Sequence, residues 1–396
     1  MKRLLSSLVA LWLIPITIYA WTSGELLIWM DPERGEALEP LAKKFQNELG
    51  IKIKIETPAN ITTNFPIVAQ AGKGPDIVIW AHDKVGEWAD GGLIAPVNVA
   101  PEFADRFFAK AWEAVMHNRT AWGYPIAMET VTLIYNKKLL VGRPPTDLSQ
   151  LVPLDRKIRS EHPAVTTILW DYQSGYYSWG IFASAGAYVF KKKGTNYDLG
   201  DVGVATPGAI EALSQIVTLV RDNILPQSVS YSETEQLMGQ GKLAMTISGP
   251  WAWSNLIMNG IDFGITPMPG INGKPAHPFV GVSAAYVNRA SSNTNLIQYF
   301  LENYLLTDKW LSAMDRAKPI GVPALISLYE KLAKKNPLVR ELNKCIGEGE
   351  VMPNIPEMGQ FFSAMGGAIQ IATENRASPE QALKDAAAEM RQPGGF

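Results

Sequence analysis

The sequence contains little of the material from which metal sites, disulfides and thiol nucleophiles are built. Its 396 residues include one cysteine, Cys345, and four histidines that lie far apart. A single thiol forms no internal disulfide, and the histidines lack the short paired spacing of a zinc site. The sequence therefore predicts no metal and no cofactor, and a core that is stabilised by burial alone.

Enzyme signatures are also scarce. No Gly-x-Ser-x-Gly elbow occurs. The stretch 239–244 superficially fits a dinucleotide glycine motif, but it leads from a predicted helix into a predicted strand, the reverse of what a phosphate site requires. The sequence thus predicts a protein that is not an enzyme and has no catalytic residues. A secreted glycoside hydrolase stays open as an alternative, because such enzymes need only two carboxylates; the candidates are Asp31, Glu33, Asp83 and Glu129.

The chain shows no strong excess of charge. The formal net charge is −2, and it becomes more negative without Lys2 and Arg3. This mild acidity argues against nucleic acid as a partner. The hydrophobic share of 47% and the charged share of 19% are typical of a globular protein, and the length suffices for two or three domains.

Long apolar runs are absent after the N-terminus. Residues 1–20 combine a basic start, a mostly apolar run and a small final residue, Ala20, which are the three parts of a secretory signal peptide. The run is short and contains Pro15, so a permanent membrane helix is the less favoured alternative. We therefore expect export to the periplasm.

Strands and helices alternate at the start of the exported chain. Apolar runs predict strands over 25–30, 51–56 and 76–79, and helical spacing predicts helices over 36–48 and 62–71. Strand–helix–strand–helix–strand at this spacing is typical of a parallel α/β unit. The fold class is therefore α/β.

Polar side chains follow the first and third of these strands. The carboxyl ends of strands in open α/β sheets are where ligands bind. A large aromatic ring beside charged groups suits a polyhydroxylated ligand, because the ring covers apolar C–H faces while the charged groups bind hydroxyls. The residues in question are Asp31, Glu33 and Arg34 after the first strand and Trp80, Asp83 and Lys84 after the third.

The stretch 121–136 differs from the alternating pattern, because two extended segments flank Glu129 without a long helix between them. Such a pair can carry the chain from one lobe to another. Glu129 lies within an apolar stretch, where a carboxylate is costly unless it is paired or hydrogen-bonded. A second α/β set follows: strands are predicted at 166–170, 243–248, 263–267 and 283–287, a loop at 171–179, and helices at 179–187, 207–222, 295–306, 308–316, 323–334, 360–373 and 379–391.

Five aromatic residues stand at strand ends or in polar stretches instead of apolar runs. Aromatic side chains at such positions are often exposed or in contact with a ligand. We therefore predict that at least two of them line one cleft. They are Trp80, Tyr176, Tyr177, Trp251 and Phe362.

Seven stretches carry a resemblance to a known family. They are GPDIVIWAHDK (74–84), YPIAMETVTLIYNK (124–137), DVGV (201–204), AMTISGPWAWSN (244–255), PFVGV (278–282), FLENYLLTD (300–308) and MPNIPEM (352–358). In this order they closely resemble the periplasmic maltose/maltodextrin-binding proteins, the solute receptors of ABC sugar importers. The resemblance runs from about Gly24 to Arg391.

The resemblance implies a two-lobed periplasmic-binding-protein fold (type II), with a ligand cleft between the lobes and a multi-strand hinge. The N-terminal lobe would comprise 21–128 plus 281–330, and the C-terminal lobe 130–279 plus 337–396. The implied partners are an oligosaccharide and a membrane ABC permease, with a chemotaxis receptor as a further option. We expect a monomer.

The resemblance also assigns polar contacts residue by residue. Asp83 matches a sugar contact, and Lys84 replaces an arginine. Glu33 and Arg34 stand where the family has an acid and a lysine, and Glu129 matches an acid at the lobe crossing.

Among the aromatic residues, Trp80 matches a sugar contact, and Tyr176 and Trp251 match stacking residues. Phe362 stands where the family has a tryptophan. These matches predict an α-linked glucose oligosaccharide as the ligand.

Several departures from the family pattern lie around this set, and they leave a different disaccharide, such as trehalose, as an alternative ligand. Each replaces a residue that contacts sugar or borders an outer subsite in the family. They are Ser174 and Gly175 in place of a glutamate–proline pair, Thr62 and Thr63 in place of two acids, and Ser363 and Gly366 in place of a tyrosine and an arginine.

Overall fold

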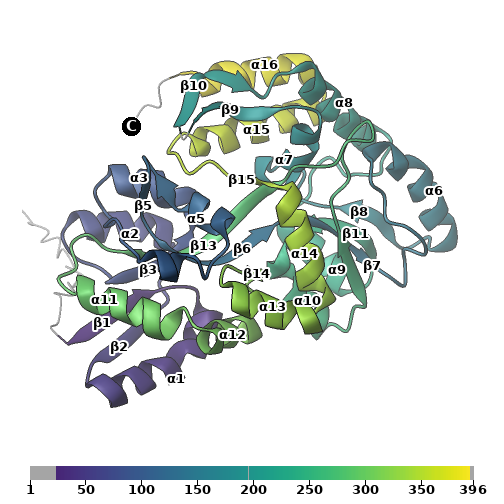
Figure 1. The fold of residues 1–396 in the computed structure, drawn as a ribbon. Coiled ribbons are helices and arrows are strands. Elements are labelled where there is room, and N and C mark those ends of the chain that lie inside the picture. The colour runs from purple at the N-terminus through teal and green to yellow at the C-terminus, as the bar shows by residue number, and fades with distance from the viewer. Residues whose placement is uncertain (1–23, 195, 393–396) are drawn as a thin grey trace, which may run out of the picture.

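The structure is a computed structural model that describes residues 24–194 and 196–392, and its elements form two groups around separate sheets (Figure 1). The predicted signal peptide, residues 1–20, lies outside the described part of the chain. None of the described helices is both long and apolar enough to cross a bilayer.

The first sheet contains the predicted parallel unit. β1 pairs in parallel with β2 and β3, as the spacing of the apolar runs predicts, and β13 adds antiparallel to β3. β15 pairs with β13 in parallel. The order across the sheet is β14 (Val322–Pro323), β6 (Tyr124–Thr130), β13 (Phe279–Val287), β3 (Ile77–Ala81), β1 (Glu25–Trp29) and β2 (Lys52–Glu56), with β15 (Glu350–Val351) beside β13.

The second sheet has four strands, in the order β12 (Phe263–Thr266), β7 (Thr132–Asn136), β11 (Leu243–Ser248) and β8 (Thr166–Leu169). Only Val131 separates β6 of the first sheet from β7 of the second. The extended pair around Glu129 therefore carries the chain from one sheet to the other, as predicted. Two small strand pairs stand apart: β9 (Tyr188–Lys193) with β10 (Asn196–Gly203), and β4 (Met116–His117) with β5 (Thr120–Ala121).

Helices pack around both sheets. α1 packs against β2 and α12, and α15 packs against α7, α8 and α16. α14 contacts β6 of the first sheet and β12 of the second. The bounds are α1 Pro32–Leu49, α2 Ile61–Gln70, α3 Val85–Asp90, α4 Pro101–Ala104, α5 Ala109–Ala114, α6 Leu151–Glu161, α7 Gly175–Ser184, α8 Pro207–Arg221, α9 Tyr231–Gly239, α10 Trp253–Met258, α11 Thr294–Phe300, α12 Asp308–Ala317, α13 Ile326–Lys335, α14 Pro337–Glu348, α15 Met358–Thr373 and α16 Pro379–Met390.

The structure corrects several predicted boundaries, among them the start of the helix predicted over 323–334, which is Ile326. α1 begins four residues before the predicted start, because the Asp31 side chain accepts the Arg34 N–H as an N-cap and Pro32 suits the first helical position. The loop predicted over 171–179 is wrong in its second half, since α7 begins at Gly175. β13 begins at Phe279, four residues before the predicted start. The helix α14 and the pair β9–β10 were not predicted at all.

Gly208 in the first turn of α8 allows a close helix contact. A Cβ atom there would lie 2.0 Å from the Ala185 carbonyl oxygen, which is backbone and cannot rotate away. We expect Gly208→Ala to lower the free energy of unfolding by roughly 2–3 kcal/mol, because the added atom overpacks this contact. Urea unfolding measures the change.

The matched control is Gly347→Ala in α14, where an added Cβ meets nothing within 4 Å. There the substitution should raise the free energy of unfolding by about 0.5–1 kcal/mol, because alanine favours a helix. Equal effects of the two substitutions would contradict the packing argument.

Candidate functional site

A cavity of about 220 Å³ opens at the carboxyl ends of β1 and β3. It brings together four of the predicted site residues, which come from segments as far apart as Asp31 and Glu129. Ser283 of β13, Met314 of α12 and Ile320 after α12 also line it. The lining residues are Asp31, Arg34, Ile79, Trp80, Ala81, Ile126, Glu129, Ser283, Met314 and Ile320. We call it the Arg34 cavity.

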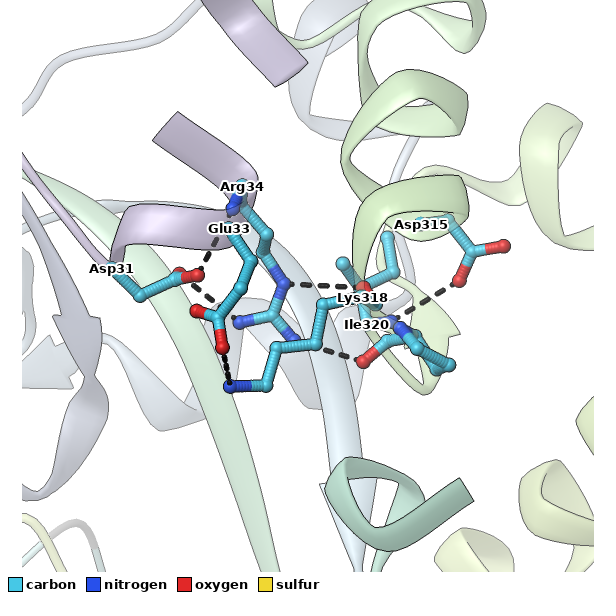
Figure 2. A network of polar contacts seen from close by, with 7 residues as sticks. Asp31, Glu33, Arg34, Asp315, Lys318 and Ile320 are labelled. Atoms are coloured by element: carbon cyan, nitrogen blue, oxygen red, sulfur yellow. Dashed lines mark hydrogen bonds and ion pairs between the residues drawn. The ribbon is translucent and has the colours of Figure 1, made fainter. Parts of the chain in front are cut away.

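The guanidinium of Arg34 is held from three directions (Figure 2). Nη1 lies 3.2 Å from Asp31 Oδ2, Nη2 donates to the Pro319 carbonyl at 2.8 Å, and Nε donates to the Lys318 carbonyl at 3.3 Å. Lys318 in turn pairs with Glu33 at 3.2 Å. These hydrogen bonds and this ion pair connect the start of α1 to the segment before β14. Arg34 is therefore oriented before a ligand binds.

The carboxylate of Glu33 is exposed at the edge of this network. Its pKa lies below the ordinary value, because a backbone N–H donates to it and the Lys318 ammonium lies beside it, against a smaller opposing effect of burial. Glu33 therefore stays ionised at neutral pH and can accept hydrogen bonds from a ligand.

Glu129 lies on β6 at the crossing between the two sheets. Burial raises the pKa of Glu129, and the nearby charges of Arg34 and Lys318 oppose that rise. Burial also raises the pKa of the Tyr176 phenol, and the carboxylates of Glu129 and Asp83 add to the rise. The Tyr176 ring of α7 lies 6.4 Å from the Phe279 ring of β13, so residues from both groups of elements meet here.

Asp83 follows β3 in a short 3₁₀ turn, His82–Lys84. Burial raises the pKa of Asp83 to about 6, and the neighbouring Lys84 only partly offsets this. The Lys84 ammonium pairs with Glu87 at 2.9 Å. Asp83 thus has an unusually desolvated carboxylate, a condition that favours a ligand supplying hydrogen bonds.

His82 is a residue whose role the sequence did not indicate. Its ring is buried; Nδ1 accepts the Val282 N–H at 3.0 Å, so Nε2 carries the proton and donates to the Met352 carbonyl at 2.9 Å. Burial lowers the pKa of His82 to about 4. His82 therefore stays neutral and fixes the turn that follows Trp80 and contains Asp83 to β13. No sequence signal points to its partners, which lie 200 and 270 positions away.

The second group of predicted residues is aromatic. The Tyr176 ring lies 6.3 Å from the Trp251 ring and 6.4 Å from the Phe279 ring, and Phe279 lies 6.4 Å from Phe362. Tyr177 also contacts Trp251, at 6.3 Å. Four of the five predicted aromatic residues thus form one continuous group with Phe279, whereas Trp80 lines the Arg34 cavity on β3. Phe279, the first residue of β13, was missed because the strand was predicted to begin only at Ser283.

Chemically, the site offers carboxylates, one fixed guanidinium and flat aromatic rings. Within residues 24–194 and 196–392, no group of three histidine, cysteine or acidic side chains is placed to hold a metal ion. Such a set binds hydroxyl groups and apolar ring faces. The two sheets, the crossing strands and this site are those of a two-lobed solute-binding protein with an α/β fold.

Comparison with known proteins gives the family. The model of the bacterial extracellular solute-binding proteins matches residues 31–310, more than half of the chain, and the chain belongs to this family. This confirms the resemblance seen in the sequence. The family description also agrees with the predicted export.

Individual relatives match over most of their length. A galactooligosaccharide-binding protein of Bacillus subtilis (strain 168) is 29% identical over 374 residues, 92% of this chain and 88% of that protein. A maltotriose-binding protein of Pyrococcus abyssi is 26% identical over 358 residues, 88% and 77% of the two chains. The maltodextrin-binding protein MdxE of B. subtilis is 28% identical over 362 residues, 89% and 85%. All three are named as binding proteins.

Proposed function

We propose that the protein is a non-enzymatic receptor that captures malto-oligosaccharides outside the cytoplasm and delivers them to an ABC permease. The observation that carries this proposal is the Arg34 cavity, where Trp80 lies beside the oriented Arg34 and the carboxylate of Glu129. Relatives named for maltotriose and maltodextrin binding support the ligand class. The compartment is the periplasm.

The proposal assigns the ligand contacts to two surfaces. Polar contacts come from the first sheet and α1, where carboxylates accept from sugar hydroxyls and Arg34 donates to them. Aromatic contacts come from the α7 and β11 side, across the crossing strands. The proposed contacts are Asp31, Glu33, Arg34, Trp80, Asp83, Lys84, Glu129, Tyr176, Trp251 and Phe362.

The proposed lobes follow the same division. One comprises 21–128 plus 281–330, and the other 130–279 plus 337–396. The placement of β6 and β7 in different sheets supports a boundary near Thr130. Closure of the lobes would bring the aromatic group onto a sugar that already lies against Trp80.

Calorimetric titration of the purified protein with maltotriose, trehalose and a galacto-oligosaccharide tests the proposal. We expect saturable binding of maltotriose, and chromatography should recover the sugar unchanged after prolonged incubation. Tighter binding of trehalose or of the galacto-oligosaccharide would mean that the assigned ligand is wrong. A relative that is 29% identical is named as a galactooligosaccharide-binding protein. Release of shorter sugars would overturn the receptor proposal in favour of a glycoside hydrolase.

A further inference from the structure

A second cavity lies between α5, the β9–β10 pair and β15. Its volume is about 520 Å³, within the range of small-molecule sites. None of its lining residues lines the Arg34 cavity. We call it the α5–β9 cavity, and its polar members include Lys110, Glu113, Lys192, Tyr197 and Glu350.

One wall of this cavity is the edge of a buried aromatic pair. The rings of Trp179 and Phe279 stack with centroids 5.2 Å apart and an interplanar angle of 9°. Phe279 is also the ring that contacts Tyr176 and Phe362 of the proposed sugar site. The wall therefore separates the two sites, and an apolar face of a second ligand could lie against its edge.

Two of the three ammonium groups that line this cavity, those of Lys110 and Lys192, have polar partners, and the third, Lys191 Nζ, lies 5.2 Å from the centroid of the Tyr188 ring. Lys110 Nζ donates to the Ile346 carbonyl at 2.8 Å and to the Gly349 carbonyl at 3.0 Å. Lys192 pairs with Glu113 at 3.0 Å. Among the described residues, Lys191 and Glu350 add one charge of each sign that has no ion pair, so the cavity does not require a ligand of strong net charge.

Besides the Lys191 ammonium, three hydrogen-bonding groups remain open. In the described part of the chain, the Glu350 carboxylate and the Tyr197 hydroxyl make no hydrogen bond or ion pair, and Lys110 has three protons for two acceptors. Glu350 lies close enough to Lys110 and Tyr197 to influence the pKa of both. The Glu350 carboxylate can accept a hydrogen bond, the Lys110 ammonium can donate one, and the Tyr197 hydroxyl can do either. These groups suit the hydroxyl groups of a neutral sugar, which both donate and accept.

From this geometry we propose that the α5–β9 cavity is a second carbohydrate site, which takes an uncharged oligosaccharide. Its open polar groups bind hydroxyls, and the edge of the Trp179–Phe279 pair contacts the apolar surface of the sugar. The inference rests on the proposed function for its ligand class, but it concerns residues that take no part in the first site.

Titration calorimetry of the purified protein with maltotriose tests this inference. We expect two equivalents for the wild type, with the second at least tenfold weaker. Trp80→Ala should lose the tight equivalent and keep the weak one. The double substitution Tyr197→Phe with Glu350→Gln should keep the tight equivalent and weaken the second at least tenfold.

Glu348→Gln is the matched control, an exposed carboxylate two positions away that does not line the cavity; it should change neither equivalent. One equivalent in the wild type and none in Trp80→Ala would overturn the second site and leave the first intact. A second equivalent unaffected by the double substitution would also overturn it. Conversely, loss of all binding in the double variant with normal binding in Trp80→Ala would support the second site and overturn the first.

Discussion

Replacing Asp83 with asparagine is expected to raise the free energy of unfolding at pH 7.5 and, at the same time, to weaken sugar binding. Burial raises the pKa of this carboxyl to about 6, so the folded protein carries a desolvated charge at neutral pH. A shift of this size corresponds to at most about 3 kcal/mol, which asparagine would recover. Binding should weaken roughly fivefold, because a neutral amide binds a sugar hydroxyl less strongly than a carboxylate does.

The pH dependence of the stability gain has a definite sign. The pKa of Asp83 is higher in the folded than in the unfolded protein, so the folded state binds more protons in the window between the ordinary aspartate value and about 6. The stability that the protonated carboxyl contributes is present below this window and is lost as the pH rises through it. The advantage of Asp83→Asn should therefore be full at pH 7.5 and vanish near pH 4.

His82 has the opposite pH dependence. Its pKa is lowered to about 4 in the folded protein, so the stability that the neutral ring contributes is present at neutral pH and is lost as the pH falls toward 4. The wild type and Asp83→Asn share this effect of His82. Comparing their free energies of unfolding at the same pH therefore removes it. Urea unfolding at pH 4, 6 and 7.5 gives the values.

The exposed Asp105→Asn variant is the control for charge removal and should change little. If Asp83→Asn were no more stable than the wild type at pH 7.5, the claim that folding desolvates the charged Asp83 carboxylate would be wrong. If the variant were more stable and bound maltotriose unchanged, Asp83 would not contact the sugar.

Trp80→Ala is expected to weaken maltotriose binding at the Arg34 cavity by about 30-fold, which leaves no tight equivalent. The Trp80 side chain lines the Arg34 cavity beside Glu129 and supplies the flat apolar surface there. Loss of that surface removes roughly 2 kcal/mol of apolar contact with the sugar, and each 1.4 kcal/mol corresponds to a tenfold change in affinity. Calorimetric titration measures the dissociation constant.

Trp122→Ala is the matched control. Trp122 is also partly buried and packs against the same hydrophobic cluster as Trp80, but its Nε1 donates to the His117 carbonyl away from the Arg34 cavity. Both variants lose a similar amount of packing, and only Trp80→Ala should lose affinity. Equal losses in the two would mean that packing of the lobe, and not a sugar contact, is responsible.

Much of the fold could be predicted because its signals are local. The parallel unit of β1, β2 and β3 follows from apolar runs at regular spacing, and the crossing at Glu129 follows from two extended segments without a helix. The predicted helix boundaries were wrong where a single contact determines where the helix begins. The Asp31 cap moves the start of α1, and α7 begins at Gly175, where the missing side chain leaves room for Met365 of α15.

The candidate site could be predicted in part for a related reason. Strand ends of a parallel unit meet at one edge, so Asp31, Arg34 and Trp80 could be grouped without coordinates. The partners that orient Arg34 could not, because the carbonyls of Lys318 and Pro319 lie 284 and 285 positions away. The hydrophobic periodicity and the spacing of residues in the sequence do not indicate contacts between such distant positions.

A crystal structure of the protein with maltotriose tests the central claim most directly. The account predicts a sugar ring against Trp80, with hydroxyls within about 3.2 Å of Asp83, Glu129 and Arg34, and a further ring against Tyr176 or Trp251. An Arg34 cavity without sugar at a saturating maltotriose concentration, or a sugar bound only elsewhere, would contradict it.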